Sequence, residues 1–255
     1  EGRFEATELL SGAVPGVFRF DIQGGVPQLL EFATSPDLNL IKDDLTKLPK
    51  IEGKARAVVG LKFPLIKNVP REKLIITQDI SLTEAAVKNI LPGVDLTEGK
   101  FVIGLDKDKI SVVGPAKLNS VAATIDWKKP RNGGEARVAV ETTLTEKMRE
   151  KFGIKLDAYM SGDVPVKLAI ENVTKEKRSI AVEADLSEVS MKVAAAGWSR
   201  PATKNTVATF NFLEDKETGR SIEDLKIDGK GLRLRGNIRL SSSNALRVID
   251  FKEVR

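Results

Sequence analysis

The strongest constraint in this sequence is an alternation of apolar and polar residues with a period of two. In the segment 18–23, FRFDIQ, every second residue is apolar, and the segment 55–63, ARAVVGLKF, follows a similar pattern. Consecutive residues of a strand point to opposite faces, so this pattern predicts strands with one apolar face. On the same basis we predict strands at 74–80, 101–105, 121–127, 136–144, 164–170, 180–186, 207–213 and 232–240.

Short polar segments separate the predicted strands, among them DKDK at 106–109, RNGG at 131–134, VTKEKR at 173–178 and EDKETGR at 214–220. Connections of this length suit antiparallel neighbours, because parallel strands need crossovers of a dozen or more residues. The sequence therefore predicts a mainly β fold, with an antiparallel sheet of about twelve one-sided strands.

Three short helices are predicted between the strands. Pro27 suits the first turn of a helix that would carry Leu29 and Leu30. The capping box Ser81-x-x-Glu84 predicts a second helix that ends at Pro92-Gly93. Thr145 is a candidate cap for a third helix. The apolar sides of these helices are expected to pack on the sheet.

The absence of cysteine and histidine narrows the chemistry that the chain can perform. It removes thiol nucleophiles, disulfides, Ser-His-Asp catalysis and the usual ligands of zinc. The adjacent acids Asp43-Asp44 and Glu214-Asp215 could act in acid-base catalysis, but neighbouring acids in loops are more often solvated. The sequence therefore predicts no enzyme, no cofactor and no metal site.

The formal net charge is +5, from 41 basic and 36 acidic residues, which is a mild excess. In the strand predicted at 232–240, three arginines alternate with leucine and isoleucine, so a phosphate-binding stripe is one interpretation. A solvated strand face is the favoured one, because no aromatic residue for base stacking is interleaved. No nucleic-acid partner is predicted.

The two tryptophans occur in one repeated phrase, Trp-x-basic-Pro, at Trp127 and Trp198. Similar strand sequences surround both copies, which indicates two degenerate β repeats, the first enlarged by the insertion with the Ser81 helix. We therefore expect a partial β unit at 1–50, a first repeat at 51–160, and a second repeat with following strands at 161–255.

So many one-sided strands have more apolar surface than three short helices can cover. Two outcomes are open: the sheet closes on itself as a sandwich or barrel, or it stays open as a groove that binds an apolar guest. The strand pattern alone does not choose between them.

Several phrases resemble YhdP-type proteins of the AsmA-like superfamily. The most distinctive is ADLSEVSMKVAAAGWSRPATKNTVATFNF at 184–212, and LEFATSPDLNLIKD, GKARAVVGLKFPLIKNV, ISVVGPAKLNSVAATIDWKKP and IDGKGLRLRGNIRL add to it. The likeness runs from about residue 4 to residue 251.

This resemblance implies a Gram-negative cell-envelope protein with a role in outer membrane biogenesis. The family is anchored in the inner membrane by an N-terminal helix and has a long periplasmic β region, a curled and elongated sheet with a hydrophobic groove. The groove is thought to carry phospholipid between the inner and outer membranes. The chain would then be an internal periplasmic fragment that reaches both membranes through other parts of the full-length protein.

The resulting hypothesis is a segment of an intermembrane lipid transport conduit whose strand residues form a β-groove for acyl chains. The alternative is a structural or scaffolding β domain of the envelope whose apolar face is buried by the protein itself. The predicted groove-lining residues are Val59, Leu61, Phe63, Ile76, Ile80, Ile103, Ile125, Val138, Val140, Val166, Leu168, Val182 and Leu234.

Overall fold

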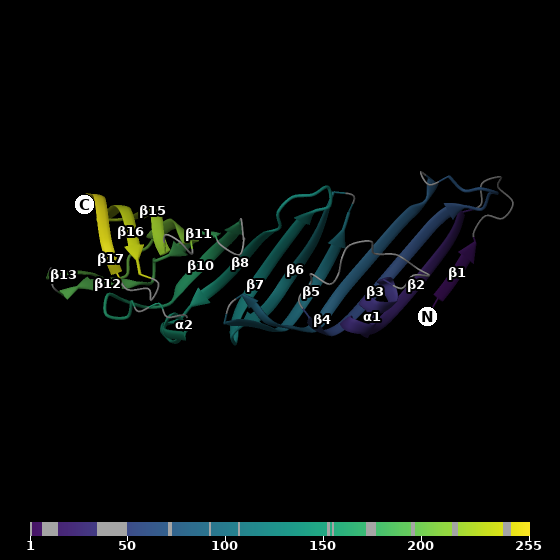
Figure 1. Ribbon diagram of the computed structural model, residues 1–255, viewed down its shortest axis with the longest axis horizontal. Helices are drawn as coiled ribbons and strands as arrows, with labels where there is room; N and C mark the ends of the chain where they lie inside the picture. The colour runs from purple at the N-terminus through teal and green to yellow at the C-terminus, as the bar shows by residue number, and fades with distance from the viewer. Residues whose placement is uncertain are drawn as a thin grey trace. The chain divides into compact units, whose positions relative to one another are not determined.

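The computed structural model describes residues 2–6, 15–34, 50–70, 73–91, 93–106, 108–151, 154, 156–171, 177–194, 197–215, 219–241 and 246–255. The fold is mainly β with antiparallel strands, as predicted, and it has two short helices among these residues where three were predicted (Figure 1). The chain divides into two compact units, Glu1–Ser120 and Val121–Arg255, a division that differs from the three predicted regions. The proposed repeat remains a prediction.

Unit 1 is an antiparallel sheet in which each strand pairs with the next one in the chain. The order is therefore the same in space and in sequence, and β2 to β5 lie side by side (Figure 1). Its elements are β1 (Gly2–Ala6), β2 (Pro15–Gly25), α1 (Val26–Thr34), β3 (Ile51–Pro64), β4 (Ile75–Leu91), β5 (Val94–Leu105) and β6 (Lys109–Leu118).

Helix α1 is the first predicted helix, and Pro27 occupies its first turn as expected. The helix packs against β2 and β3. A Cβ atom on Gly24 would lie 3.5 Å from Leu29 Cδ2, so Leu29 lies over the end of β2. The apolar side of α1 therefore covers this end of the sheet.

The helix predicted at Ser81 is wrong, because these residues continue strand β4 as far as Leu91. A serine three residues before a glutamate does not by itself exclude a strand, and here β4 pairs with both β3 and β5. The buried side chains are those of Leu82, Ala85 and Val87. Their spacing of three and then two residues departs from the strict alternation of a regular strand.

The irregular spacing in β4 comes from bulges that cross three adjacent strands. Gly53, Glu84 and Glu98 have φ angles of 126°, 55° and 52°, and the β3–β4 and β4–β5 registers shift beside them. Both glutamates pair with a lysine of a neighbouring strand, Glu84 with Lys54 at 2.9 Å and Glu98 with Lys117 at 2.7 Å. Bulges bend strands, so the sheet of unit 1 is bent along this line.

Unit 2 has a large antiparallel sheet and a small one of order β13-β12-β9. The large sheet consists, in spatial order, of β7 (Val121–Pro130), β8 (Arg137–Leu144), β10 (Val164–Glu171), β11 (Lys177–Asp185), β14 (Val207–Asp215), β15 (Gly219–Gly229), β16 (Leu232–Leu240) and β17 (Leu246–Val254). The small sheet consists of β9 (Met160–Ser161), β12 (Ser190–Val193) and β13 (Trp198–Arg200).

The small sheet packs on one face of the large sheet. Met160 of β9 and Met191 of β12 lie against a core cluster that includes Val166 and Val189, and Val189 is completely buried. Helix α2 (Glu146–Lys151) is the third predicted helix, and the backbone amide of Arg149 donates to the Thr145 carbonyl at 3.0 Å. These elements cover one end of the large sheet's apolar face.

Two buried arginines connect this covering layer to the rest of unit 2. Arg149 Nη1 donates to the carbonyl of Gly162 at 2.8 Å, and its Nη2 donates to Asp157 Oδ1 at 3.2 Å. Arg200 Nη2 donates to Thr206 Oγ1 at 2.8 Å. In the second copy of the Trp-x-basic-Pro phrase, the basic residue Arg200 therefore has a structural role.

The two copies of that phrase lie in different settings. Trp127 belongs to β7 of the large sheet, where it pairs with Val138. Trp198 begins β13 of the small sheet, where it pairs with Val193. The phrase therefore has no common structural role.

Neither unit is closed into a barrel within the described ranges, because the strand order is linear and β1 and β17 each have one strand neighbour. Among the described residues, 14 strands follow one another in linear order and 3 strands form the small sheet. The sequence predicted about twelve strands. Neither helix of the described part has the length and apolarity needed to cross a membrane.

The burial of Arg149 generates a stability prediction. Replacing Arg149 with methionine leaves the Leu144 and Gly162 carbonyls without their donor, and we expect unit 2 to lose about 2–4 kcal/mol. Urea unfolding followed by tryptophan fluorescence measures this, because both tryptophans lie in unit 2. Lys147→Met, at an exposed position of the same helix, is the control; equal losses in the two variants would contradict the assignment.

Candidate functional site

The apolar side chains of unit 1 gather on one face of its sheet. Residues directly opposite each other in antiparallel strands point to the same face, so the register defines rows of side chains across the strands. The Phe18 row consists of Phe18, Leu61 and Ile76. The Ile80 row consists of Ile22, Ala57, Ile80, Ile103 and Val112.

On this face, aromatic stacking connects β2 with β3. The ring centroid of Phe18 lies 6.1 Å from that of Phe20 and 5.7 Å from that of Phe63, with nearly parallel planes. Offset stacking at these distances adds to the stabilisation from apolar burial.

Much of this face is open to solvent. Helix α1 packs at one end of it, and among the residues that the structure describes no other helix lies on unit 1. Ile76 is 58% exposed and Phe20 is 42% exposed. Gln78, opposite Val59, also lies on this face between Ile76 and Ile80. Exposed apolar side chains beside polar ones make this face a candidate binding surface.

All six predicted groove residues of unit 1 lie on this face. Leu61, Ile76, Ile80 and Ile103 belong to the two rows, and Val59 and Phe63 lie on the same side of β3 opposite Phe20 and Gly16. Sequence reasoning left Phe18 and Ile22 out of the predicted lining although the same alternation includes them.

Unit 2 has three rows of mostly apolar side chains on one face of its large sheet. The Phe212 row consists of Trp127, Val138, Ile170, Ile180, Phe212, Ile222, Ile238 and Ile249. The Leu168 row consists of Ile125, Val140, Leu168, Val182 and Phe210. The Ala184 row consists of Ala123, Thr142, Val166, Ala184, Ala208, Ile227, Leu234 and Val254.

The seven predicted groove residues of unit 2 also share one face but differ in burial. Val138, Leu168, Val182 and Leu234 are half-buried. Val166 is 4% exposed and belongs to the core cluster under the small sheet. The buried members of the predicted set are Ile125, Val140 and Val166. We therefore treat Ile125, Val140 and Val166 as core residues and exclude them from the open surface.

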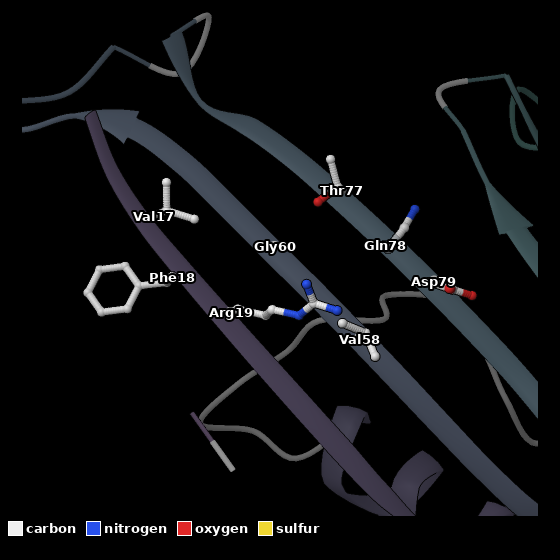
Figure 2. Close-up of a pocket in the computed structure, with 8 residues that line it drawn as sticks. All are labelled: Val17, Phe18, Arg19, Val58, Gly60, Thr77, Gln78 and Asp79. Atoms are coloured by element: carbon white, nitrogen blue, oxygen red, sulfur yellow. The ribbon is translucent and has the colours of Figure 1, made fainter. Parts of the chain in front are cut away.

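The opposite face of unit 1 carries most of its charged residues, and it also has the exposed apolar side chains of Ile75, Val102 and Val113. A shallow hollow of about 290 Å³ lies there, lined by Val17, Phe18, Arg19, Val58, Gly60, Thr77, Gln78 and Asp79. Figure 2 shows the Arg19 side chain extending over β3 toward Val58, whereas the Phe18 side chain points away from β3. The hollow exists because Gly60 has no side chain, since a Cβ atom there would contact Thr77 Oγ1.

An ion pair on the polar face perturbs one carboxyl group. Arg56 donates from Nη2 to Asp21 Oδ2 at 2.6 Å and from Nε to Asp21 Oδ1 at 3.0 Å. This hydrogen bonding, with a smaller contribution from Gln23, lowers the pKa of Asp21 to about 2. The pair lies between β2 and β3, and it marks this face as the solvated one.

The residues that the structure describes contain no group of three or more acidic, histidine or cysteine side chains that could hold a metal ion. The acids Asp43 and Asp44 lie outside the described residues. Glu214 is half-buried in an ion pair with Arg220, which differs from the predicted solvated loop.

Comparison with known proteins gives one distant relative. The chain is similar to an NAD(P)+ glycerol-3-phosphate dehydrogenase of Chlorobium phaeobacteroides (strain BS1), with 27% identity over 165 residues. The match covers 61% of this chain and 45% of that protein, so the chain spans less than half of the relative's length. No family model and no solved structure matches the chain.

This similarity contradicts the prediction that the chain is not an enzyme, because the relative is a dehydrogenase. The prediction was based on the absence of cysteine and histidine and on the expectation that the adjacent acids are solvated and not catalytic. Neither criterion bears on cofactor-dependent hydride transfer, in which the cofactor supplies the chemistry. We withdraw it.

The Asp21–Arg56 pair generates a pH prediction. The lowered pKa means that the pair stabilises the fold above the ordinary carboxyl pKa and that this contribution is lost as the pH falls toward 2. In Arg56→Gln we expect the pKa of Asp21 to rise toward its ordinary range, measured by carboxyl ¹³C NMR titration. Arg19→Gln on the same face is the control; an unchanged Asp21 titration in Arg56→Gln would refute Arg56 as the cause of the lowered pKa.

Proposed function

We propose that the apolar sheet faces hold the acyl chains of lipids, and that the chain is a periplasmic segment of an intermembrane phospholipid transport conduit. The observation that carries the proposal is the Ile80 row, which runs without a polar residue across five strands, β2 to β6. The aliphatic side chains of this row therefore form a continuous path across the strands instead of a single pocket.

The length of this path suits an acyl chain. Strands lie about 4.8 Å apart, so a row across five strands spans about 19 Å. The hydrocarbon core of a bilayer is about 30 Å thick, so one leaflet's acyl chains extend about 15 Å. A lipid tail laid along the Ile80 row would contact side chains over its whole length.

The chemistry of the row suits movement along it. Each buried methylene contributes about 0.8 kcal/mol, so binding comes from many small and nearly equal contributions. The Ile80 row contains only isoleucine, alanine and valine, without an aromatic residue that would fix a tail in one place. A tail can therefore shift by one strand and exchange one set of contacts for a similar one.

The resemblance to YhdP-type proteins supports the same proposal. It would place the chain in the periplasm of a Gram-negative envelope, connected to the inner and outer membranes through segments beyond this sequence. Phospholipid is then the proposed cargo, and the cell envelope is the proposed compartment.

The scaffolding alternative is favoured by a separate observation, the covered end of the unit 2 face. There the small sheet buries Val164, Val166 and Ala184 against the protein itself. If the remaining rows were covered in the same way by a protein partner, no lipid would bind. Phospholipid in an organic extract of the purified protein, detected by mass spectrometry, distinguishes the two functions.

The dehydrogenase similarity supports a second candidate, oxidation of glycerol 3-phosphate with a nicotinamide cofactor. Dinucleotide sites are usually built on parallel βαβ units, whereas the strand pairs described above for both units are antiparallel. The test is direct: purified protein is incubated with glycerol 3-phosphate and NAD+ or NADP+, and absorbance at the nicotinamide band is followed. Turnover above a no-protein control would establish this candidate.

The conduit proposal predicts a face-specific effect of charge. Leu61 lies between Phe18 and Ile76 on the apolar face, so Leu61→Glu places a carboxylate where the tail would lie. Because an unpaired charge is costly in an apolar environment, we expect co-purified phospholipid to fall about fivefold or more. The matched control is Lys62→Glu, which makes the same residue at the next position of β3 on the opposite face.

The amount of lipid is compared in preparations whose thermal unfolding matches that of the unchanged protein. We expect loss in Leu61→Glu and retention in Lys62→Glu. Equal lipid content in both variants, or no phospholipid in the unchanged protein, would reject the conduit.

A further inference from the structure

The end of unit 1 at which β3 turns into β4 exposes several large apolar side chains. Leu65 and Ile66 lie in the turn, and Ile75 and Ile76 begin β4. These four residues, which we call the hairpin tip, are between 42% and 58% exposed. Large apolar side chains that gather in solvent often mark a surface that contacts a partner or a membrane.

Backbone contacts hold both sides of the turn in place. The backbone amide of Ile66 donates to the Pro64 carbonyl at 2.8 Å, and that of Lys73 donates to the Pro70 carbonyl at 3.0 Å. Leu65 lies over β2, because a Cβ atom on Gly16 would be 2.8 Å from Leu65 Cδ2. The fold itself therefore presents these apolar side chains at the end of the hairpin.

The hairpin tip is apolar on both faces of the sheet. Ile75 pairs with Lys62 and Ile76 pairs with Leu61, and consecutive residues of a strand point to opposite faces. Among the described residues the pairing of β4 with β5 begins at Ile80, so both isoleucines lie beyond the paired part of β5. A protein docked on one face would cover only one of them. Exposure on both faces favours surroundings that enclose the end of the hairpin.

The charge around the hairpin tip is positive. The segment 62–73 contains four basic residues and one acidic residue. Lys62, Lys67 and Lys73 are exposed, and within the described part of the chain none of them has an ion-pair partner. Lysine has a long aliphatic stem, so its ammonium group can stay at the headgroup level while neighbouring apolar side chains lie deeper. This charge is complementary to an anionic lipid surface.

We propose that the hairpin tip inserts into the headgroup region of an anionic phospholipid bilayer, with these three lysines at the lipid phosphates. The inference goes beyond the proposed function, because it concerns the surface of a membrane and needs no lipid tail on the Ile80 row. It gives unit 1 its own membrane contact, at the end of β3 and β4.

A fluorescent label at a single cysteine tests insertion directly. The chain has no cysteine, so Ile66→Cys, Ile75→Cys and Val102→Cys each provide one labelling site. Val102 is the control, because it is an exposed apolar residue of β5 away from the turn. Each labelled chain carries the environment-sensitive dye nitrobenzoxadiazole and is mixed with vesicles of phosphatidylcholine and phosphatidylglycerol in equal amounts. We expect a blue shift of the emission at positions 66 and 75 and none at position 102.

Co-sedimentation with the same vesicles tests the role of charge. Lys67→Gln combined with Lys73→Gln is expected to weaken binding about tenfold or more, since each lysine near an anionic surface contributes about fivefold. Lys50→Gln combined with Lys100→Gln is the matched control, because it removes the same charge from exposed positions of unit 1 outside the turn. Leu65→Glu is also expected to weaken binding, because a carboxylate is costly in an apolar environment.

Variants are compared only when their thermal unfolding matches that of the unchanged protein. The proposal is overturned if the labels at positions 66 and 75 do not respond, or if the Lys67 and Lys73 variant binds as tightly as its control. It is also overturned if vesicles of phosphatidylcholine alone bind as tightly as the mixed vesicles, or if position 102 responds as strongly as position 75. Absence of vesicle binding would leave a protein as the partner of the hairpin tip. None of these results decides the conduit, which depends on lipid along the Ile80 row.

Discussion

The antiparallel register is the constraint on which the rest of this structure depends. Because each strand pairs with its chain neighbour, every second side chain is brought beside its counterpart on the next strand, and a local alternation becomes a continuous surface. A shift of one residue at β3 would move Leu61 to the polar face and Lys62 to the apolar one. The ion pair of Asp21 with Arg56 on one face and the stacked Phe18 and Phe63 on the other both favour the observed register.

Each unit covers one end of its apolar face, and most side chains of the remaining rows are half-buried. In unit 1 the covering element is α1, and in unit 2 it is the small sheet, connected through the buried Arg149 and Arg200. A covered end gives the sheet a true core, which supplies stability without a second complete layer. Under the proposed function the remaining rows hold acyl chains, which suit their aliphatic composition better than a polar substrate would.

Sequence reasoning predicted the features that depend on regular alternation, and it failed where bulges interrupt the pattern. The apolar positions of β3 and β10 follow the period of two and were identified, as was α1 from Pro27. In β15 the apolar residues Ile222, Leu225 and Ile227 have unequal spacing because of a bulge, so this strand was not predicted. The helix at Ser81 was wrong because its capping-box sequence also fits a strand, and bulges in β4 interrupt the alternation that would have identified that strand. The burial of Val166 could not be foreseen, since the small sheet that covers it is assembled from three short and distant segments.

The central claim is that the Ile80 row is an uncovered path occupied by lipid tails. The most direct measurement places a photo-crosslinking amino acid at Ile80 and, in a separate protein, at the adjacent Asp79 on the opposite face, followed by irradiation in living cells and mass spectrometry of the adducts. We expect phospholipid adducts at position 80 and none at position 79. Adducts to protein alone at position 80, or lipid adducts of equal yield at both positions, would contradict the claim.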